Sequence, residues 1–410
     1  MLLKNSVKYF LLCIICLNLG VFAEQQETLE ETAKKVATFK FKETKKIPEE
    51  VKAKVAKNNK VFVGTSLPLK QEGRVVASAM DMVFRKSKLD KRIVLVARDD
   101  RKSVARSLKN IRKLLHETKI FSNIFMSGLI EEVLTDIKNN EFLIFAPEEN
   151  SEFLMDAQYK GLIHTKASIR EELEAIIDYA VSTLKKYTFG VFFEDNILGQ
   201  NGAKVAESII KRYTNENSNI RFLAAESYPR GTVDVDLVAK KMGKIRPEVV
   251  ICISRRHATY NFTLECLNQG LFRTVFLGTS YLLPIQKLLE QSRGVNFIAT
   301  SVLPNPTKSK IPLIQKYRKD MKTFFPGEPY NLLSLNGYFN ASILLELISR
   351  IPGKVTHEKI IEQAEALDGE IDGVKLKFNQ KTRQLYNDLW ISPSYKSDWI
   401  SAKKRFDGGA

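Results

Sequence analysis

The segment TFGVFFEDN, residues 188–196, is a nearly continuous apolar run that ends in charged and polar side chains. Four further runs of this kind follow it along the chain: IRFLAAES (220–227), PEVVICIS (247–254), RTVFLGTS (273–280) and VNFIATSVLP (295–304). Amphipathic segments of helical period separate them. Strands of a parallel sheet that is covered on both faces are apolar almost throughout, and helices connect them. This part of the chain is therefore predicted to form one doubly wound α/β unit.

The same alternation occurs earlier in the chain. Its apolar runs are VFVGTSL (61–67), RIVLVARDD (92–100), NIFMSG (123–128), EFLIFAP (141–147) and a fifth around Gly161 to His164. Between the runs lie helical patterns, for example Val104 to Thr118, in which Leu108, Ile111 and Leu114 recur at steps of three residues. The alternation is repeated without sequence repetition, which indicates two Rossmann-like lobes of like topology rather than a solenoid.

After residue 304 the chain has the pattern of a return to these lobes. Two long helical patterns (308–325 and 332–351) and a helix (357–367) precede a tail that is predicted to be a hairpin of VKLKF (374–378) and LYNDLWIS (385–392), turned at Asn379-Gln380. The tail is too short for a domain of its own, so we expect the chain to cross between the lobes more than once. The expected division assigns residues 60–165 and 304–350 to lobe 1 and residues 166–303 and 351–410 to lobe 2.

Residues 1–23 have the features of a signal peptide. Lys4 and Lys8 precede an apolar run, Tyr9 to Leu17. That run is shorter than the roughly 20 residues that a membrane span requires. Small residues ending at Ala23 fit the cleavage pattern before Glu24. The mature protein is therefore expected to begin near Glu24 and to be exported to the periplasm.

The residues that follow are expected to be released in soluble form. A lipid anchor on Cys16 would need a small residue before it, and Ile15 occupies that place. Residues 24–59 form a Glu- and Lys-rich extension, which is predicted to be a tether or a loose helix. A monomer is expected, although nothing in the sequence sets the oligomeric state.

The chain is strongly basic, with a formal net charge of +17 that falls to +15 once the signal peptide and its two lysines are removed. Its lysines and arginines are spread along every predicted helix with acids between them, and no nucleic-acid motif occurs. Nucleic acid is therefore not expected as a partner. In an exported protein, a positive net charge of this size favours solubility, attraction to an anionic membrane surface, or a preference for anionic ligands.

Neither a metal site nor an active site is predicted. The CxxC of the signal peptide is lost with it, and Cys252 and Cys266, in a predicted strand and a predicted helix, are expected to be buried thiols, although a disulfide between them stays open. The four histidines are scattered singly, without metal-ligand spacing. Asp99 and Asp100 are adjacent on a strand and would point to opposite faces, which is unsuited to joint acid–base catalysis. No cofactor and no catalytic residue are predicted.

Several segments are similar to one known family. They are VFVGTSLPL (61–69), RIVLVARDD with the basic helix after it, YTFGVFFEDNILGQNGAKVAESI (187–209), AESYPRGTVDVDLVAKKMGKIRPEVVICI (225–253) and LNQGLFRTVFLGTSYL (267–282). Together they resemble the type I periplasmic binding proteins, which include the leucine/isoleucine/valine-binding proteins of ABC importers. The resemblance covers nearly all of residues 60–395. It implies two lobes joined by three crossover strands, a small-molecule ligand bound in the cleft by hinge closure, and an ABC permease in the inner membrane as partner.

The resemblance also implies positions for ligand contacts. In the family's amino-acid binders, hydroxyls and amides of two loops of the first lobe hold the ligand carboxylate, and here those loops contain Ser127-Gly128 and Glu148 to Ser151. Glu149 places negative charge where a carboxylate would bind, whereas Asn150 is expected to donate a hydrogen bond. Ordinary turn and helix-capping chemistry is an equally good explanation of Ser127 and Asn150.

Other positions depart from the family pattern. Glu72 and Leu198 stand before glycines where the family commonly has an aromatic residue, and Thr279-Ser280 replace the acid that grips an amino-acid ammonium. Arg255-Arg256 fall where a tyrosine is common, and at most one of the pair is expected to point into the cleft. A branched-chain amino acid is therefore not the expected ligand.

Two explanations of Arg255 stay open at this point. With Glu149 it would hold a zwitterion in reversed polarity, or the two would form an ion pair without any ligand. The expected function is solute binding for an ABC importer, with a small polar and preferably anionic ligand. The alternative is a sensing or regulatory protein with the same fold, for example a regulator of cell-wall synthesis, which the charged extension and the altered ligand positions would suit.

Overall fold

The computed structural model describes residues 61–87, 93–122 and 141–402. The predicted signal peptide, the charged extension and the loop with Ser127 and Gly128 lie outside these residues. The chain divides into two compact units, which are described separately. Unit 1 comprises Met1–Glu149, Lys310–Ala364 and Ile371–Val374, and unit 2 comprises Asn150–Ser309, Glu365–Glu370 and Lys375–Ala410. The chain thus passes between the units more than once, and unit 1 continues to Ala364 where the sequence-based division ended it at residue 350.

Unit 1 is built on parallel strands that lie in the order β2-β1-β3-β4. Their bounds are β1 (Val61–Leu67), β2 (Ile93–Asp99), β3 (Ile120–Ser122) and β4 (Leu143–Phe145). Its helices are α3 (Gly73–Lys86), α4 (Val104–Thr118), α11 (Pro312–Phe324), α12 (Leu332–Ser349) and α13 (His357–Glu365). The strands are buried almost throughout, as the continuous apolar runs predicted.

Local sequence explains where the helices of unit 1 begin and how they pack. α4 starts at the N-cap Ser103, whose hydroxyl accepts from the Arg106 amide. α12 packs on α3 so closely that a Cβ at Gly337 would lie 2.4 Å from the carbonyl oxygen of Val76. Among the described residues, α12 is the one helix long and apolar enough to cross a membrane, and most of it is buried in the core of unit 1.

Unit 2 is built on the parallel strands β7-β6-β8-β9-β10, and two antiparallel strands, β13 and β14, extend the sheet beyond β10. Their bounds are β6 (Thr188–Glu194), β7 (Arg221–Tyr228), β8 (Val249–Ile253), β9 (Val275–Gly278), β10 (Phe297–Ser301), β13 (Trp390–Ser392) and β14 (Ile400–Ser401). The short strand β5 (Leu162–Ile163) precedes them in the chain.

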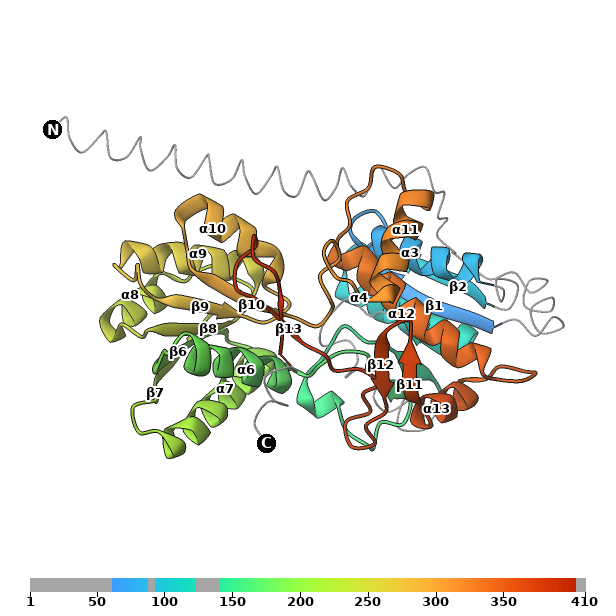
Figure 1. Ribbon diagram of the computed structural model, residues 1–410, viewed down its shortest axis with the longest axis horizontal. Helices are drawn as coiled ribbons and strands as arrows, with labels where there is room; N and C mark the ends of the chain where they lie inside the picture. Colours follow the sequence, from blue (N-terminus) through green and yellow to red (C-terminus); the bar gives the residue numbers. More distant parts are fainter. Residues whose placement is uncertain (1–60, 88–92, 123–140, 403–410) are drawn as a thin grey trace. The chain divides into compact units, whose positions relative to one another are not determined.

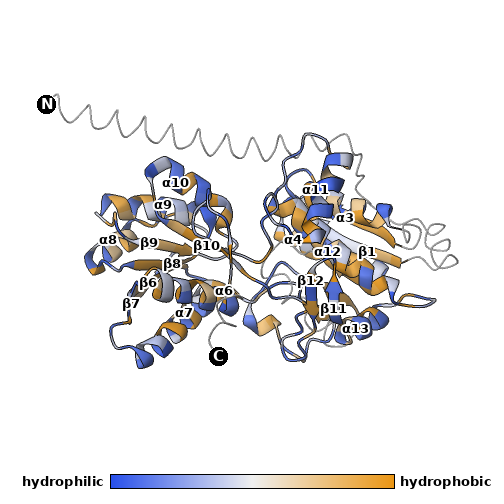
Figure 2. Cartoon of the chain, in the orientation of Figure 1, coloured by the Kyte–Doolittle hydropathy of each residue, from blue (hydrophilic) through white to orange (hydrophobic). Residues whose placement is uncertain are grey.

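Helices cover both faces of this sheet. α6 (Ile169–Asp178) and α7 (Ile197–Glu216) lie on one face, and α8 (Asp236–Ile245), α9 (Arg256–Asn268) and α10 (Gln286–Arg293) lie on the other (Figure 1). A π-helical turn, Tyr179–Thr183, continues α6, and two 3₁₀ turns lie at Glu152–Leu154 and Leu283–Ile285. The strands between the helix layers are strongly hydrophobic (Figure 2). Phe192 of β6 and Phe262 of α9 stack face to face with ring centroids 3.8 Å apart.

The two units share one winding pattern, which confirms the predicted α/β doubly wound fold. In each, the second strand of the unit lies outside the first, and the third and fourth follow on the other side. The strand order therefore reverses between β1 and β3 in unit 1 and between β6 and β8 in unit 2. Ligands of such sheets bind beyond the carboxyl ends of the strands at these switch points.

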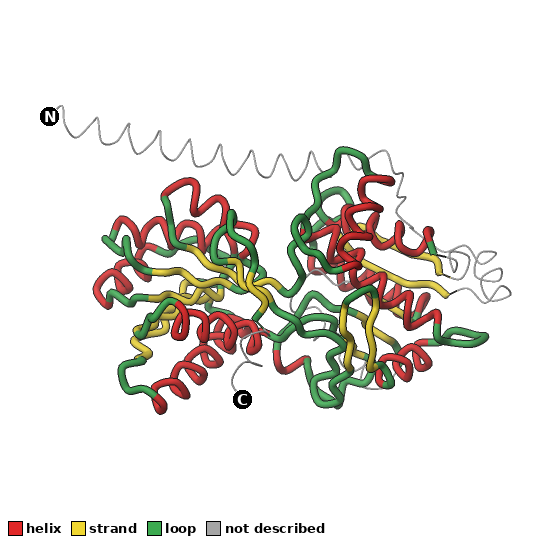
Figure 3. The backbone as a smooth tube through the Cα atoms, in the orientation of Figure 1, coloured by secondary structure: helices red, strands yellow, loops and turns green. Residues whose placement is uncertain are grey.

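The predicted hairpin of the tail is confirmed at its turn but is wrong in its longer strand pairing. The Lys377 amide donates to the Leu385 carbonyl oxygen at 3.1 Å, and Asn379 and Gln384 form an isolated antiparallel bridge. β12 (Val374–Lys377) pairs with β11 (Asp368–Ile371), as the adjacent short strands in Figure 3 show, and Trp390–Ser392 instead pairs antiparallel with β10. A further turn, which joins β11 to β12, lies at Asp372-Gly373, where φ is 48° and 82°. Asp-Gly is a favoured pair for a two-residue turn with both φ angles positive, and the prediction did not include this turn. In unit 1, β3 is Ile120–Ser122, and the predicted run at 123–128 directly after it lies outside the described residues.

Candidate functional site

The switch point of unit 2 holds a buried carboxylate. Glu194 ends β6, and its side chain is 6% exposed. It accepts hydrogen bonds from Asn196 Nδ2 at 2.6 Å and from the Gly231 amide at 2.8 Å, and it pairs with Arg255 Nε at 2.9 Å. Gly199 lets α7 begin this close to β6, because a Cβ there would lie 2.0 Å from the Glu194 carbonyl oxygen. Loops after β6, β7 and β8 therefore meet at one acid.

A buried tyrosine completes this cluster. The hydroxyl of Tyr228, at the end of β7, accepts from Ser254 Oγ at 3.0 Å and from the Arg255 amide at 3.4 Å. Burial raises the pKa of Tyr228, so the phenol stays neutral. Arg255 is thus fixed through its backbone amide and its guanidinium. Because Glu194 neutralises its charge, Arg255 does not require an external anion.

Arg256 is held differently. Its Nε donates to the Tyr281 carbonyl oxygen at 2.8 Å, and its guanidinium carbon lies 4.7 Å from the centroid of the Tyr281 ring. The ring is 54% exposed. No carboxylate within the described part of the chain pairs with Arg256. The structure therefore separates the two adjacent arginines that the sequence left equivalent: Arg255 has an internal acid, and Arg256 rests on an aromatic ring.

A second buried acid lies beside this loop. Glu172, in the first turn of α6, is 1% exposed. Ser280 donates to its carboxylate twice, from the amide at 2.6 Å and from Oγ at 3.0 Å, and Thr300 donates from its hydroxyl. Burial raises the pKa of Glu172, and the hydrogen bonds from Thr300 and Ser280 oppose that rise. Thr279-Ser280 replace the family's acid in the sequence, but a carboxylate still lies beside Ser280, and it belongs to Glu172 of α6.

Asn150 belongs to the same cluster. Its side-chain nitrogen donates to Glu172 at 2.9 Å and to the Ala167 carbonyl oxygen at 3.0 Å, and its own carbonyl accepts from the Ile169 amide. An amide nitrogen has two protons to donate, so both are used inside unit 2. In this arrangement Asn150 fastens the start of α6, and donation to a ligand stays a prediction.

The remaining predicted residues are spread over both units. In unit 1, Glu72 pairs with Lys102 at 3.0 Å beyond the ends of β1 and β2, and Glu149 is buried. In unit 2, Leu198 lies half-buried in the first turn of α7, and Thr279 is 8% exposed at the end of β9. The structure thus brings Ser280 and Asn150 together at Glu172. Sequence reasoning missed Glu172, Glu194, Tyr228 and Tyr281.

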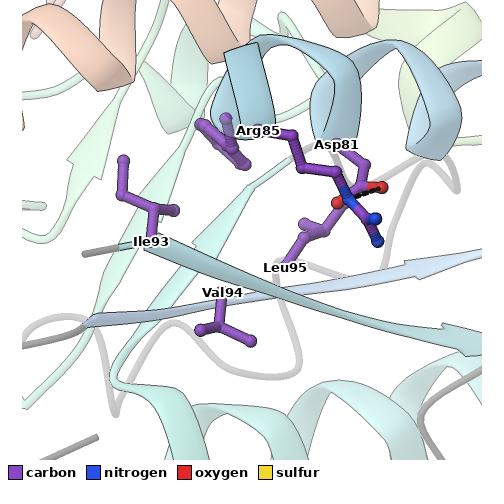
Figure 4. Close-up of a pocket in the computed structure, with 6 residues that line it drawn as sticks. Asp81, Arg85, Ile93, Val94 and Leu95 are labelled. Atoms are coloured by element: carbon purple, nitrogen blue, oxygen red, sulfur yellow. Dashed lines mark ion pairs between the residues drawn. The ribbon is translucent and has the colours of Figure 1, made fainter. Parts of the chain in front are cut away.

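A hollow of about 380 Å³ in unit 1 is separate from these residues. It is lined by the end of α3 and the start of β2, with Asp81, Phe84, Arg85, Ile93, Val94 and Leu95 (Figure 4). Arg85 pairs with Asp81 at 2.8 Å, and burial raises the pKa of the Asp81 carboxyl. Because Ile93 to Leu95 begin β2, the hollow lies at the opposite edge from the carboxyl ends of the strands. It is not the candidate ligand site.

Cys252 in β8 and Cys266 in α9 are buried free thiols, as the sequence predicted, and burial raises the pKa of both. Neither is therefore a reactive thiolate at neutral pH. Among the residues that the structure describes, no group of three or more His, Cys, Asp or Glu side chains is placed to hold a metal ion.

Known structures with the same fold come from several bacteria. A possible leucine/isoleucine/valine-binding protein from Rhodopirellula baltica has a TM-score of 0.70 at 21% identity, over 84% of this chain and 96% of its own. A substrate-binding periplasmic protein from Ralstonia solanacearum has a TM-score of 0.68 at 20% identity, over 83% and 99%. An ABC transporter solute-binding protein from R. palustris, in complex with benzoate, has a TM-score of 0.69 at 11% identity, over 83% and 95%. At these identities the likeness concerns the fold.

Comparison of sequences gives two results. A search of curated proteins finds no significant match. The family model described as periplasmic binding protein matches residues 68–394, which is most of the chain and includes both units. The chain therefore belongs to the periplasmic binding protein family.

Proposed function

We propose that this protein is the solute-binding component of an ABC importer, that it works in the periplasm with a membrane permease as partner, and that its ligand is a small anion. Family membership supports the binding role. The neighbours support transport, since one is an ABC transporter solute-binding protein that holds benzoate, a carboxylate. In this role the protein binds and releases its ligand without a chemical step.

Arg256 is the observation on which the ligand's charge rests. Its guanidinium lies on the Tyr281 ring at the carboxyl ends of β8 and β9, and no acid in the described ranges neutralises it. A guanidinium fixed through Nε keeps its two terminal nitrogens for a carboxylate or phosphate. Stacking on an aromatic ring further restricts its orientation. A small anion with an apolar or flat body would contact both side chains.

Arg255 is assigned a different role. Because Glu194 already pairs with it, a bound anion would compete with that buried carboxylate. We therefore assign Arg255 and Tyr228 to the support of the loop that presents Arg256. Ser280, Asn150 and Thr279 likewise shape the site from within unit 2. Glu72, Glu149, Leu198, Ser127 and Gly128 remain proposed ligand contacts from the sequence.

Small molecules that co-purify with the mature protein test this function. The protein would be purified from a periplasmic extract without added ligand and denatured, and the released molecules would be identified by mass spectrometry. We expect an anion in wild type and at least tenfold less of it in Arg256→Ala. The matched control is Arg293→Ala, an exposed arginine at the end of α10, which should keep the wild-type yield. A released neutral or cationic molecule would argue against the proposal, as would an anion retained equally by Arg256→Ala.

A further inference from the structure

We propose that Glu172 is a positioning residue that holds the ligand-side loop Thr279–Tyr281 and two of the segments linking the units, near Asn150 and Thr300, in one arrangement. The inference rests on the proposed function, because it treats Tyr281 and Arg256 as ligand contacts. Nothing in the family match assigns a role to this acid.

The geometry supplies a single carboxylate shared by three separate parts of the chain. Its four hydrogen-bond donors are the amide and hydroxyl of Ser280, the hydroxyl of Thr300 and the side-chain amide of Asn150. A carboxylate has about four lone-pair positions, so Glu172 is fully used by these donors. With 1% of the residue exposed, loss of the carboxylate would leave buried donors without an acceptor.

The donors to Glu172 lie at or near the places where the chain passes between the units. Asn150 is the first residue of unit 2 after the chain leaves unit 1, and Thr300 lies in β10 shortly before the chain leaves unit 2 after Ser309. Ser280 directly precedes Tyr281, whose carbonyl binds Arg256. Glu172 therefore connects the proposed ligand loop to two linking segments through one hydrogen-bonded contact each.

The neighbouring acid, Glu171, accepts hydrogen bonds from a third segment that links the units. Glu171 accepts from Gln384 at 2.8 Å and from Asn387 at 2.7 Å, and it also closes the capping box of α6 with Ser168. Gln384 and Asn387 follow the last return of the chain to unit 2, after Val374. The first turn of α6 thus fastens three stretches that enter or leave unit 2.

The consequence is a physical link between ligand contact and the linking segments. A ligand that moves the Tyr281 loop displaces Ser280. This movement shifts the amide and the hydroxyl of Ser280, which both donate to Glu172. The carboxylate must follow the loop or lose those bonds, and either change alters its contacts with Thr300 and Asn150. Coupling of this kind is carried by chains of contacting groups between two sites, and Tyr281, Ser280, Glu172 and Thr300 form such a chain.

Hydrogen–deuterium exchange on the ligand-free mature chain tests the inference. In Glu172→Ala we expect amide exchange to rise about tenfold in three segments together: 278–282, 300–309 and 150–168. The sheet segments 188–194 and 249–253 should keep wild-type exchange. The control is Glu174→Ala on the same helix, whose partner is the exposed Arg212 at 3.3 Å. It should leave all five segments unchanged.

Three outcomes would overturn the inference: no change in the linking segments, a rise confined to α6, or a uniform rise through unit 2, which would mark a defect of the fold. If Glu172→Ala does not fold, Glu172→Gln is measured in the same way, since it keeps the shape and one acceptor and should show the same pattern at smaller size. No ligand is added, so the result is independent of whether the protein binds an anion.

Discussion

The carboxylate of Glu194 pairs with the guanidinium of Arg255 at 2.9 Å inside unit 2, where the strand order of the sheet reverses. This position is the usual ligand crevice of a doubly wound sheet, and here the protein's own ion pair occupies it. The arrangement leaves the adjacent Arg256 as the cation that faces outward on Tyr281. The role of each arginine is therefore set by which one the buried acid neutralises.

Replacing Glu194 by alanine should destabilise the protein. The change leaves the Gly231 amide and the Asn196 side chain without their acceptor, while the exposed Arg255 can turn to water. We expect a loss of about 1–3 kcal/mol in the free energy of unfolding, measured by urea denaturation. Glu226→Ala removes a surface pair with Lys241 at the neighbouring strand and should cost at most about 1 kcal/mol. Equal losses in the two variants would contradict the buried role of Glu194.

His164 should make the protein sensitive to mild acid. Its ring is fully buried beside the Leu154 carbonyl, and desolvation lowers its pKa from 6.5 to about 3. The unfolded chain therefore takes up a proton below pH 6.5 that the folded chain refuses until about pH 3, so stability falls as the pH falls through this window. At pH 5.5 the cost is about 1.4 kcal/mol relative to neutral pH.

The variant His164→Gln isolates this effect. It lacks the titrating group, so the difference in unfolding free energy between pH 7.5 and pH 5.5 should shrink by about 1.4 kcal/mol relative to wild type. Acids such as Glu172 titrate equally in both proteins and cancel in the comparison. An unchanged pH dependence would show that His164 is not held neutral in the fold.

Arg383 fastens another part of unit 2. The residue is 2% exposed, and its guanidinium donates to Glu365 at 2.7 Å, to the Lys160 carbonyl at 2.6 Å and to the Leu162 carbonyl at 3.1 Å. Arg383→Ala should cost about 1–3 kcal/mol in thermal or chemical unfolding, because it leaves buried carbonyl oxygens unsatisfied and removes the partner of the half-exposed Glu365. Arg350→Ala, which removes a surface pair along α12, is the control and should cost about 0.5 kcal/mol. A loss below 1 kcal/mol for Arg383→Ala would refute this assignment.

Contact between α12 and α3 requires a glycine. Gly337→Ala would place a methyl group 2.4 Å from the Val76 carbonyl oxygen, which forces the helices apart. We expect a loss of about 1–3 kcal/mol and a lower melting temperature. Gly369→Ala meets nothing within 4 Å and should leave the melting temperature within error of wild type. If both substitutions are neutral, the close approach of the helices is not maintained in solution.

Much of the fold could be predicted because parallel strands that are buried on both faces appear in the sequence as continuous apolar runs. β1 and the helix Val104–Thr118 have the bounds that the sequence indicated. The tail could not be assigned by the same means, because short strands at a sheet edge have no comparable pattern. There the turn at Asn379-Gln380 was predicted and is present, whereas the Asp372-Gly373 turn, which local sequence also encodes, was missed.

The candidate site was harder to predict because its acids come from distant parts of the chain. Glu172 lies 108 residues from Ser280 and 128 residues from Thr300, and locally it is one of two glutamates that follow the helix cap Ser168. Capping chemistry explains either glutamate, and only the fold shows that Glu171 closes the cap while Glu172 turns inward. The same holds for Arg255 and Arg256. They differ in their partners: Glu194 at the end of β6 pairs with Arg255, and Tyr281 after β9 contacts Arg256.

The most direct test of the central claim is a thermal-shift titration of the mature protein and its Arg256→Ala and Arg293→Ala variants with benzoate, succinate, inorganic phosphate, glucose and putrescine. A ligand that binds the folded state raises the melting temperature. We predict that at least one of the three anions raises it in wild type and in Arg293→Ala, and that Arg256→Ala weakens the fitted affinity about ten- to hundredfold, the loss expected for a charged hydrogen-bond pair. Glucose and putrescine should have no effect. A shift produced by glucose or putrescine but by no anion, or an anion affinity that Arg256→Ala leaves unchanged, would contradict the account.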